Sequence, residues 1–302
     1  MTIKITASLV KELRERTGSG MMECKKALVA SNGDIDVAID EMRKSGMAKA
    51  GKKSDRTAAE GCIAINITDD AKQAVMIEIN CETDFVTKGD DFQQFADAVS
   101  AQALSKQPAD LDALLALPLN DGNDLSIEDA RKALIAKIGE NVNVRRFISV
   151  TSNGLVASYS HGDQIGVLVA LDNGSAELGK DIAMHVAASK PAAISEKDIP
   201  AQQISDERAI LISQATAESE ASKKPKPAEI IEKMVEGRIR KYMAEITLYG
   251  QPFVKDPDVT VGQLVEKTNS TVTQIMRFEV GEGIEKKEDN FAEEVMAQAR
   301  GV

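Results

Sequence analysis

Few side chains of this sequence are arranged for covalent or metal chemistry. The 302 residues include two histidines and three cysteines, and Cys24, Cys62 and Cys81 form no CxxC pair and have no nearby histidine. We find no Ser/His/Asp set, no carboxylate pair beside a plausible cleft and no cluster with metal-ligand spacing. We therefore expect no enzyme, no metal site and no cofactor. Free thiols predict a reducing compartment, and we expect a cytoplasmic protein.

Residues 46–53, GMAKAGKK, have the GxxxxGK form of a phosphate-binding loop but depart from it in two respects. Lys53 stands where a Ser or Thr should hold magnesium, and a predicted helix rather than a strand comes before the segment. We interpret residues 46–57 as a basic linker. Without a nucleotide site of its own, the chain is expected to act on another molecule.

The least ordinary combination of side chains is Asp84-Phe85, in the stretch AVMIEINCETDFV at 74–86. Val75, Ile77 and Ile79 alternate with more polar residues, which predicts a strand with one buried face. A short polar turn then leads to the acid and the aromatic ring. Two interpretations follow from these residues: Phe85 folds back into the core, as aromatic side chains usually do, or the strand holds a rigid finger that inserts into a partner.

Composition predicts a globular chain with a core of aliphatic side chains and much helix. Hydrophobic residues make up 43% and charged residues 28%, with 3% aromatic residues and no tryptophan. The net charge of −11 argues against a nucleic-acid partner, although the segment 1–56 is basic. The N-terminus resembles no signal peptide, and no stretch approaches the ~20 apolar residues of a membrane span. We therefore expect neither nucleic acid nor membrane as a partner.

Segment 1–56 is predicted to form a three-helix module followed by the basic linker. The apolar spacing indicates helices that end near Gly18, Gly33 and Gly46, and Asp34 is expected to cap the third. Segments 57–144 and 145–284 then repeat one order of hairpin, strand, loop and helix. Asn153-Gly154 predicts a tight turn that pairs 147–151 with 155–159. The fold class is therefore α+β, with two related subdomains of small antiparallel sheets.

The second subdomain contains an insertion, and the chain ends in a further predicted helix. We place the insertion at 190–228, where an amphipathic segment runs into a Pro-containing turn before a second helix at 228–243. This predicts a projecting helical hairpin. Segment 285–302 is predicted to be a C-terminal helical module, with an apolar face in 290–299.

Seven segments carry a resemblance to one protein family along nearly the whole chain. They are ITASLVKELRERTGSGMMECKKAL, GDIDVAIDEMRKSG, NCETDFV, KIGENVNVRR, HVAASKP, GQPFV and RFEVGEGIEK, in this order. The chain resembles elongation factor Ts, the nucleotide-exchange partner of the GTPase elongation factor Tu. The resemblance implies that the N-terminal module is of the ubiquitin-associated type and docks on the nucleotide-binding domain of the GTPase.

The resemblance also assigns partner-binding residues. In the family, the segment matching Thr83, Asp84, Phe85 and Val86 displaces the magnesium ion of elongation factor Tu, which favours the finger over the core interpretation. Further candidate contacts are Met21, Met22, Lys25 and His161. Met21 and Met22 could instead belong to the module core, and a lysine or histidine on a surface usually has no special role. In the family this hairpin is a coiled-coil dimerisation arm, so the resemblance implies a homodimer, with a solvated helix pair lacking self-contact as the alternative.

The function that we expect is guanine-nucleotide exchange on elongation factor Tu, in its GDP-bound and nucleotide-free states, during translation elongation. A scaffold or chaperone-like protein that binds through the N-terminal module without changing nucleotide release is the main alternative. A nucleic-acid adaptor using the basic end is a third, which the overall acidity disfavours. Acceleration of GDP release by substoichiometric protein separates the first possibility from the second.

Overall fold

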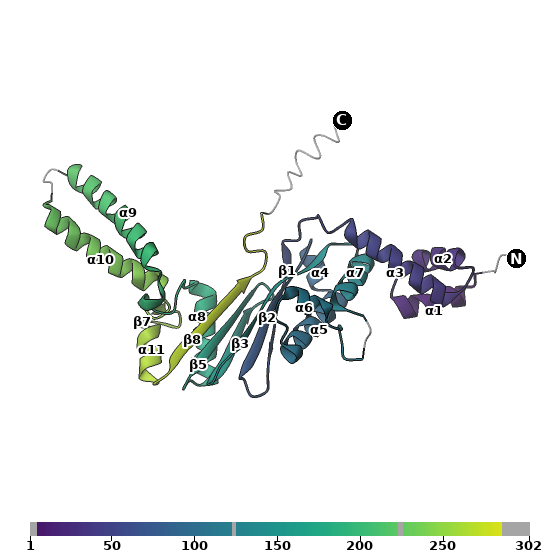
Figure 1. Cartoon of the computed structure of the whole chain (residues 1–302). Helices are drawn as coiled ribbons and strands as arrows, with labels where there is room; N and C mark the ends of the chain where they lie inside the picture. Colours follow the sequence, from purple (N-terminus) through teal and green to yellow (C-terminus); the bar gives the residue numbers. More distant parts are fainter. Residues whose placement is uncertain (1–4, 123–124, 223–225, 286–302) are drawn as a thin grey trace, which may run out of the picture. The chain divides into compact units, whose positions relative to one another are not determined.

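The computed structural model describes residues 5–122, 125–222 and 226–285, apart from the side chains of 47–49. It is a mixed structure of helices and small sheets, which confirms the predicted α+β class (Figure 1). The chain forms two compact units: Met1–Ala64, Ile77–Phe147 and Glu279–Val302 make the first, and Ile65–Met76 with Ile148–Phe278 make the second. The predicted C-terminal helix at 290–299 lies outside the described residues.

The first part of the chain contains seven helices and three strands within the described residues. They are α1 (Ala7–Thr17), α2 (Met21–Ala30), α3 (Ile35–Gly51), β1 (Glu60–Ile67), β2 (Gln73–Cys81), α4 (Asp84–Thr87), α5 (Asp90–Lys106), α6 (Leu111–Ala116), α7 (Ile127–Ile138) and β3 (Val142–Thr151). The strands pair in the order β1-β2-β3. Strand β2 lies in the middle of this sheet and is buried from Ala74 to Cys81.

The N-terminal module is the predicted set of three helices. Asp34 caps α3 by accepting a hydrogen bond from the Val37 N–H at 3.0 Å, and Gly18 ends α1 in the left-handed conformation (φ 66°). Leu13, Cys24, Leu28 and Ala38 form its core. The spacing of apolar residues and the capping residues therefore predicted this module correctly.

Gly46 does not end the third helix, so the prediction of a linker beginning at 46 was wrong. Helix α3 continues to Gly51, and Gly46 is buried within it. A Cβ atom at position 46 would lie 3.1 Å from Cβ of Ala136 in α7. The glycine therefore permits the close approach of two helices and is not a helix terminator.

The second part of the chain contains the remaining elements. They are β4 (Leu155–His161), β5 (Ile165–Asp172), α8 (Ala176–Ser189), a 3₁₀ turn (Glu196–Asp198), α9 (Ala201–Glu220), α10 (Ala228–Ile246), β6 (Pro252–Phe253), β7 (Asp256–Thr260), α11 (Val261–Lys267) and β8 (Thr271–Glu279). Strand β5 lies between β4 and β8, and helix α8 packs across β4 and β5. Aliphatic side chains of β5 and α8, including Val169, Leu171 and Ile182, form the core.

The predicted pairing of 147–151 with 155–159 was wrong, because β3 belongs to the β1-β2-β3 sheet. Strand β4 instead pairs antiparallel with β5, from Leu155 opposite Leu171 to His161 opposite Ile165. Neither Asn153 nor Gly154 has the positive φ that a primed hairpin turn requires. A Cβ atom at 154 would collide with the carbonyl oxygen of Leu171, so close backbone approach explains the glycine.

The helical hairpin is formed by α9 and α10 and extends away from the β4-β5-β8 sheet of its own unit (Figure 1). Ala215, Val235 and Ile239 are its buried contacts. The second helix runs to Ile246, so the hairpin is not contained in 190–228. An isolated bridge between Ala193 and Thr247 closes its base.

Candidate functional site

Phe85 is exposed, which excludes its interpretation as a core residue. Its exposed fraction is 81%, the highest among the large apolar side chains that the structure describes as exposed. The ring is carried by α4, a single helical turn that follows the buried strand β2 after two residues. We call Thr83–Val86 the finger. A large aromatic ring held in water by a rigid strand is typical of a binding surface.

Asp84 lies beside Phe85 on the same turn and is also exposed. Its carboxylate is 4.0 Å from Nζ of Lys88, one turn along the chain, and both side chains are largely in solvent. Such an exposed pair contributes little to stability, so Lys88 does not prevent the carboxylate from meeting a cation or a donor of a partner. Val86 is half-buried and Thr87 is buried, so the exposed part of the finger is narrow.

The base of the finger is held by residues that sequence reasoning did not single out. Glu140 accepts hydrogen bonds from the Thr83 N–H at 3.0 Å and from Thr83 Oγ1 at 2.8 Å. Glu82 accepts one from the Asn141 N–H at 2.6 Å. These partners are more than fifty residues apart in sequence, so no local pattern connects them. The sequence signal for Glu140 and Asn141 was that both lie in KIGENVNVRR, one of the segments that carry the family resemblance.

The N-terminal module presents a second apolar surface. Met21 and Met22 are 60% and 67% exposed, so neither belongs to the module core as the alternative interpretation required. Lys25 is exposed on the same helix. Val29 and Val37 are also exposed large apolar residues, and neither was predicted. The spacing of Met22, Lys25 and Val29 along α2 places them on one helix face.

His161 lies in the other unit, at the end of β4. It is exposed, and its Nδ1 is 3.2 Å from the hydroxyl of Tyr159. The structure thus gathers Thr83, Asp84, Phe85 and Val86 on one turn and Met21, Met22 and Lys25 on one helix. His161 instead contacts Tyr159, its neighbour on β4.

Comparison with known proteins gives one consistent result. The model of the family described as elongation factor TS matches residues 82–282. The chain belongs to the elongation factor Ts family. It is 58% identical over 299 residues to the elongation factor Ts of Methylococcus capsulatus, covering 99% of both chains. It is 59% identical over 298 residues to that of Alkalilimnicola ehrlichii and 54% identical over 296 residues to that of Legionella pneumophila, covering 98% of this chain and 99% of each relative.

Among the described residues, no group of three or more His, Cys, Asp or Glu residues is placed to hold a metal ion. Cys24, Cys62 and Cys81 are buried free thiols. Burial, followed by the charge of Glu140, raises the pKa of Cys81 to about 12, so this thiol stays protonated. In the described part of the chain, we find no helix long and apolar enough to span a membrane.

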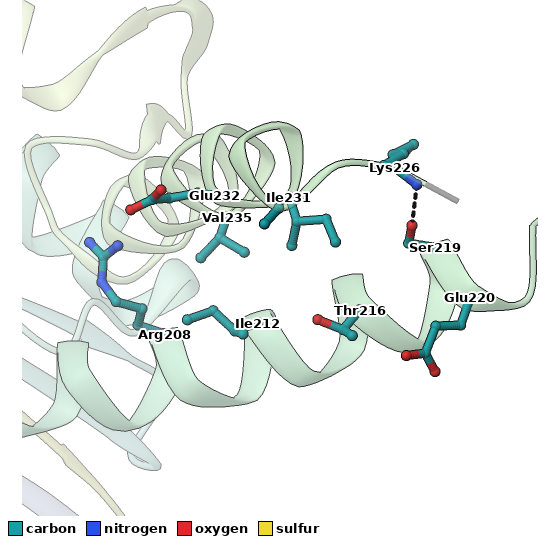
Figure 2. A pocket seen from close by; sticks show the side chains of 10 residues that line it. Arg208, Ile212, Thr216, Ser219, Glu220, Lys226, Ile231, Glu232 and Val235 are labelled. Carbon is teal, nitrogen blue, oxygen red and sulfur yellow. Dashed lines mark hydrogen bonds between the residues drawn. The ribbon is translucent and has the colours of Figure 1, made fainter. Parts of the chain in front are cut away.

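A cavity of about 570 Å³ lies between the two helices of the hairpin (Figure 2). Ile212, Ile231 and Val235 supply apolar side chains to it, and Arg208 and Glu232 line it as well. At the tip, Ser219 Oγ accepts a hydrogen bond from the Lys226 N–H at 2.6 Å. The lining contains no histidine or cysteine.

His185 is a buried packing residue on α8. Its Nδ1 accepts a hydrogen bond from the Val254 N–H at 3.2 Å, so the ring proton is assigned to Nε2, which donates to Gln251 Oε1 at 2.9 Å. Burial lowers the pKa of His185, and the hydrogen bond to Gln251 opposes this shift. The ring is therefore neutral when the protein is folded at neutral pH.

The lowered pKa of His185 predicts a loss of stability in mild acid. The pKa of His185 in the unfolded chain is about 6.5. Above this pH the ring is neutral in both the folded and the unfolded state, so His185 adds no pH dependence to stability. Below it, the unfolded state binds the extra proton, and stability falls by at most ~1.4 kcal/mol per pH unit. We expect the melting temperature of His185→Gln to fall less between pH 7.5 and pH 5.5 than that of the wild type. His161→Gln is the matched control, and an equal fall in all three proteins contradicts the prediction.

Proposed function

We propose that this chain is a guanine-nucleotide exchange factor for elongation factor Tu and acts through the finger. The observation that carries the proposal is the exposed ring of Phe85 on a turn whose base is fixed to strand β2 and to Glu140. In this proposal, Phe85 inserts near the nucleotide site of the GTPase, and Asp84 disturbs its magnesium region. The factor binds the GDP-bound and nucleotide-free states during translation elongation in the cytoplasm.

The physical basis is the reciprocal coupling of two ligands on one protein. A GTPase holds GDP through backbone donors to the phosphates and through Mg²⁺. If the factor binds the empty GTPase more tightly than the GDP form, GDP must weaken the binding of the factor by the same ratio. A thousandfold ratio requires about 4 kcal/mol of differential contact. A buried aromatic ring and a displaced cation can supply this over a small area.

The remaining surfaces hold the GTPase while the finger acts. Met21, Met22, Lys25 and Val29 are exposed side chains of α2, three of them apolar and one cationic, and are suited to a groove on the partner. His161 is proposed as a weaker contact. We propose segments 1–56, 57–144, 145–284 and 285–302 as the functional divisions.

The direct test measures the release of fluorescent GDP from elongation factor Tu. One part of this protein to about fifty parts of GDP-loaded GTPase, with excess unlabelled GTP, is expected to discharge all of the label at an accelerated rate. An exchange factor is released and acts again, whereas a scaffold changes at most the fraction of GTPase that it occupies. Release limited to the stoichiometric fraction contradicts the proposed function.

Self-association through the hairpin is a separate proposal with its own prediction. Ile210, Ile212 and Ile230 are 46–51% exposed on α9 and α10, which favours burial against a second copy. Replacing residues 200–245 with a short Gly-Ser linker leaves the bridge between Ala193 and Thr247 in place. We expect the mass from light scattering to fall from dimer to monomer, with GDP exchange unchanged. Ile210→Glu with Ile230→Glu is the milder control. A wild-type mass of one chain contradicts the dimer.

A further inference from the structure

Thr83 occupies the N-cap position of α4 but does not use its hydroxyl to cap the helix. Its backbone is extended (φ −129°, ψ 154°), as at a normal N-cap, yet the helix has no side-chain cap hydrogen bond. A threonine at this position ordinarily accepts a hydrogen bond from an amide of the first helical turn. Here the hydroxyl donates to a carboxylate from a distant part of the chain. The geometry thus gives the residue a different role.

That carboxylate belongs to Glu140, at the corner between α7 and β3. Gly139 ends α7 in the left-handed conformation (φ 90°), and Glu140 follows before β3 begins. One carboxylate oxygen accepts from the Thr83 N–H and the other from the Thr83 hydroxyl, at 3.0 and 2.8 Å. Two charge-assisted hydrogen bonds to one residue fix both its position and its orientation.

A second carboxylate makes the reciprocal contact. Glu82 Oε1 accepts a hydrogen bond from the Asn141 N–H at 2.6 Å. The neighbouring residues 82 and 83 thus supply one carboxylate and one amide, and so do residues 140 and 141. The side chain of Asn141 donates in turn to the carbonyl oxygens of Arg56 at 2.8 Å and Ser54 at 3.3 Å. The base of the finger is thereby joined to the segment that follows α3.

Hydrogen bonds hold the backbone of the finger on both sides of the Phe85 ring. At the first end, the Cys81 thiol lies 3.1 Å from the Thr83 carbonyl oxygen, which it reaches as a donor. At the other end, Thr87 Oγ1 donates to the Asp84 carbonyl oxygen at 2.7 Å, and Gln93 Nε2 donates to the Thr87 carbonyl oxygen at 2.5 Å. Between these contacts, the side chains of Asp84 and Phe85 face solvent.

We propose that Glu140 is a positioning residue that fixes the direction of the finger through Thr83. The inference rests on the proposed function for its kinetic consequence, but the geometric claim concerns this chain alone. Without the Glu140 carboxylate, the Thr83 N–H and hydroxyl lose the acceptor that they share, and the ring of Phe85 samples a range of directions. A displacement of about 1 Å in a reacting or inserting group can reduce a rate by up to ~10²-fold.

Glu140→Ala is expected to slow the maximal rate of GDP release about tenfold, while the affinity for nucleotide-free elongation factor Tu changes much less. Thr83→Val, which removes the hydroxyl and keeps the N–H, is expected to give a smaller reduction of the same kind. Thr83→Ser and Glu140→Gln, which retain the hydroxyl and one acceptor respectively, should recover most of the rate. Glu266→Ala, an exposed glutamate on α11, is the matched control.

A double-mutant cycle separates a positioning role from a general structural one. If Glu140 acts through Phe85, Glu140→Ala added to Phe85→Ala produces no further reduction in rate. An equal reduction in both backgrounds overturns the proposal, as does a wild-type rate for Glu140→Ala. If Phe85→Ala alone leaves the rate unchanged, the proposed function of the finger fails. The positioning role of Glu140 is then tested by a measurement on the free chain.

The free chain provides that independent measurement. The amide at position 83 donates to Glu140, and its hydrogen exchange is expected to be faster in Glu140→Ala and in Thr83→Val than in the wild type, with the exchange of β2 unchanged. Faster exchange at position 83 with an unchanged β2 supports the positioning role. Unchanged exchange at position 83 in both variants overturns it, whatever the kinetics of the complex. Thr83→Val provides this measurement even if Glu140→Ala does not fold.

Discussion

Phe85→Ala is expected to slow the release of GDP from elongation factor Tu by about a hundredfold without affecting the fold of this chain. Fully burying an aromatic side chain contributes about 3 kcal/mol, which corresponds to roughly a hundredfold change at ~1.4 kcal/mol per decade. In the free protein the ring is 81% exposed, so its removal loses almost no internal contact. The melting temperature should therefore stay within error of the wild-type value.

The measurement is stopped-flow release of fluorescent GDP at saturating factor, so that the maximal rate and the half-saturating concentration are obtained separately. Phe85→Leu, which keeps apolar volume, should retain part of the rate. Asp84→Asn isolates the contribution of the charge. Val254→Ala, an exposed apolar residue in the other unit, is the matched control. A maximal rate for Phe85→Ala equal to that of the wild type contradicts the role of the ring.

Met22→Ala should show the opposite kinetic pattern. Its side chain belongs to the apolar surface of the N-terminal module, which in our proposal holds the GTPase without disturbing the nucleotide. We expect a higher half-saturating concentration and a nearly unchanged maximal rate, since binding that is equal in both states changes affinity alone. This contrast tests whether docking and exchange are carried by different residues.

Local patterns predicted the elements of this fold better than their pairing. The alternation at Val75, Ile77 and Ile79 predicted β2, and the Asp34 side chain predicted the start of α3. These signals act within a few residues, so they can be recognised in the sequence. Gly46 and Asn153-Gly154 misled the prediction, because a glycine required for close approach to another element resembles one required for a turn.

In the candidate site, too, local patterns predicted the element but not its long-range contacts. The sequence predicted that Asp84 and Phe85 follow a strand, but it left open whether the ring is buried, since a core aromatic and an exposed one have the same local context. The structure decides this through exposure. The contacts from Glu140 to Thr83 and from Glu82 to Asn141 span 57 and 59 residues. Contacts of this kind depend on the whole fold and have no periodic signature.

Loss of the Glu78 side chain is predicted to destabilise the first unit strongly. It lies on β2 with no exposed surface, and its carboxylate is 2.9 Å from Nη1 of Arg145 and 2.6 Å from Nε of Arg146. It also accepts hydrogen bonds from the Gly281 N–H at 2.8 Å and from Asn80 Nδ2 at 3.0 Å. Four donors thus converge on one buried carboxylate.

The electrostatic balance at Glu78 favours the charged form. Burial by itself raises the pKa of Glu78, but the hydrogen bond from Gly281, followed by those from Arg145, Asn80 and Arg146, outweighs burial and lowers the pKa. A carboxylate with a lowered pKa contributes stability above the pKa of the unfolded chain, and this contribution is lost as the pH falls through the folded pKa. The full contribution is therefore present at pH 7.

Glu78→Ala leaves two arginines and the Gly281 N–H without their shared acceptor. Removing one partner of a buried ion pair typically costs 3–5 kcal/mol, and we expect about 3 kcal/mol, because the arginine side chains are 25% and 33% exposed and water screens them. For a unit of this size, the loss lowers the melting temperature by roughly 6–12 °C. Glu78→Gln, which keeps the shape but removes the charge, should be intermediate, and Glu12→Ala on the exposed face of α1 is the control.

The position of the residue gives this prediction a second readout. Arg145 Nη2 donates to the Glu282 carbonyl oxygen at 2.5 Å, and Arg146 pairs with the Glu282 carboxylate at 3.3 Å, so the cluster holds the segment around Gly281 onto β2 and β3. In Glu78→Ala, limited proteolysis should cut near 280–285 faster than in the wild type. The difference in melting temperature should also narrow as the pH falls through the lowered pKa of folded Glu78, where the wild-type carboxylate becomes protonated. A difference that does not depend on pH, with unchanged proteolysis, shows that Glu78 contributes by packing and not by its charge.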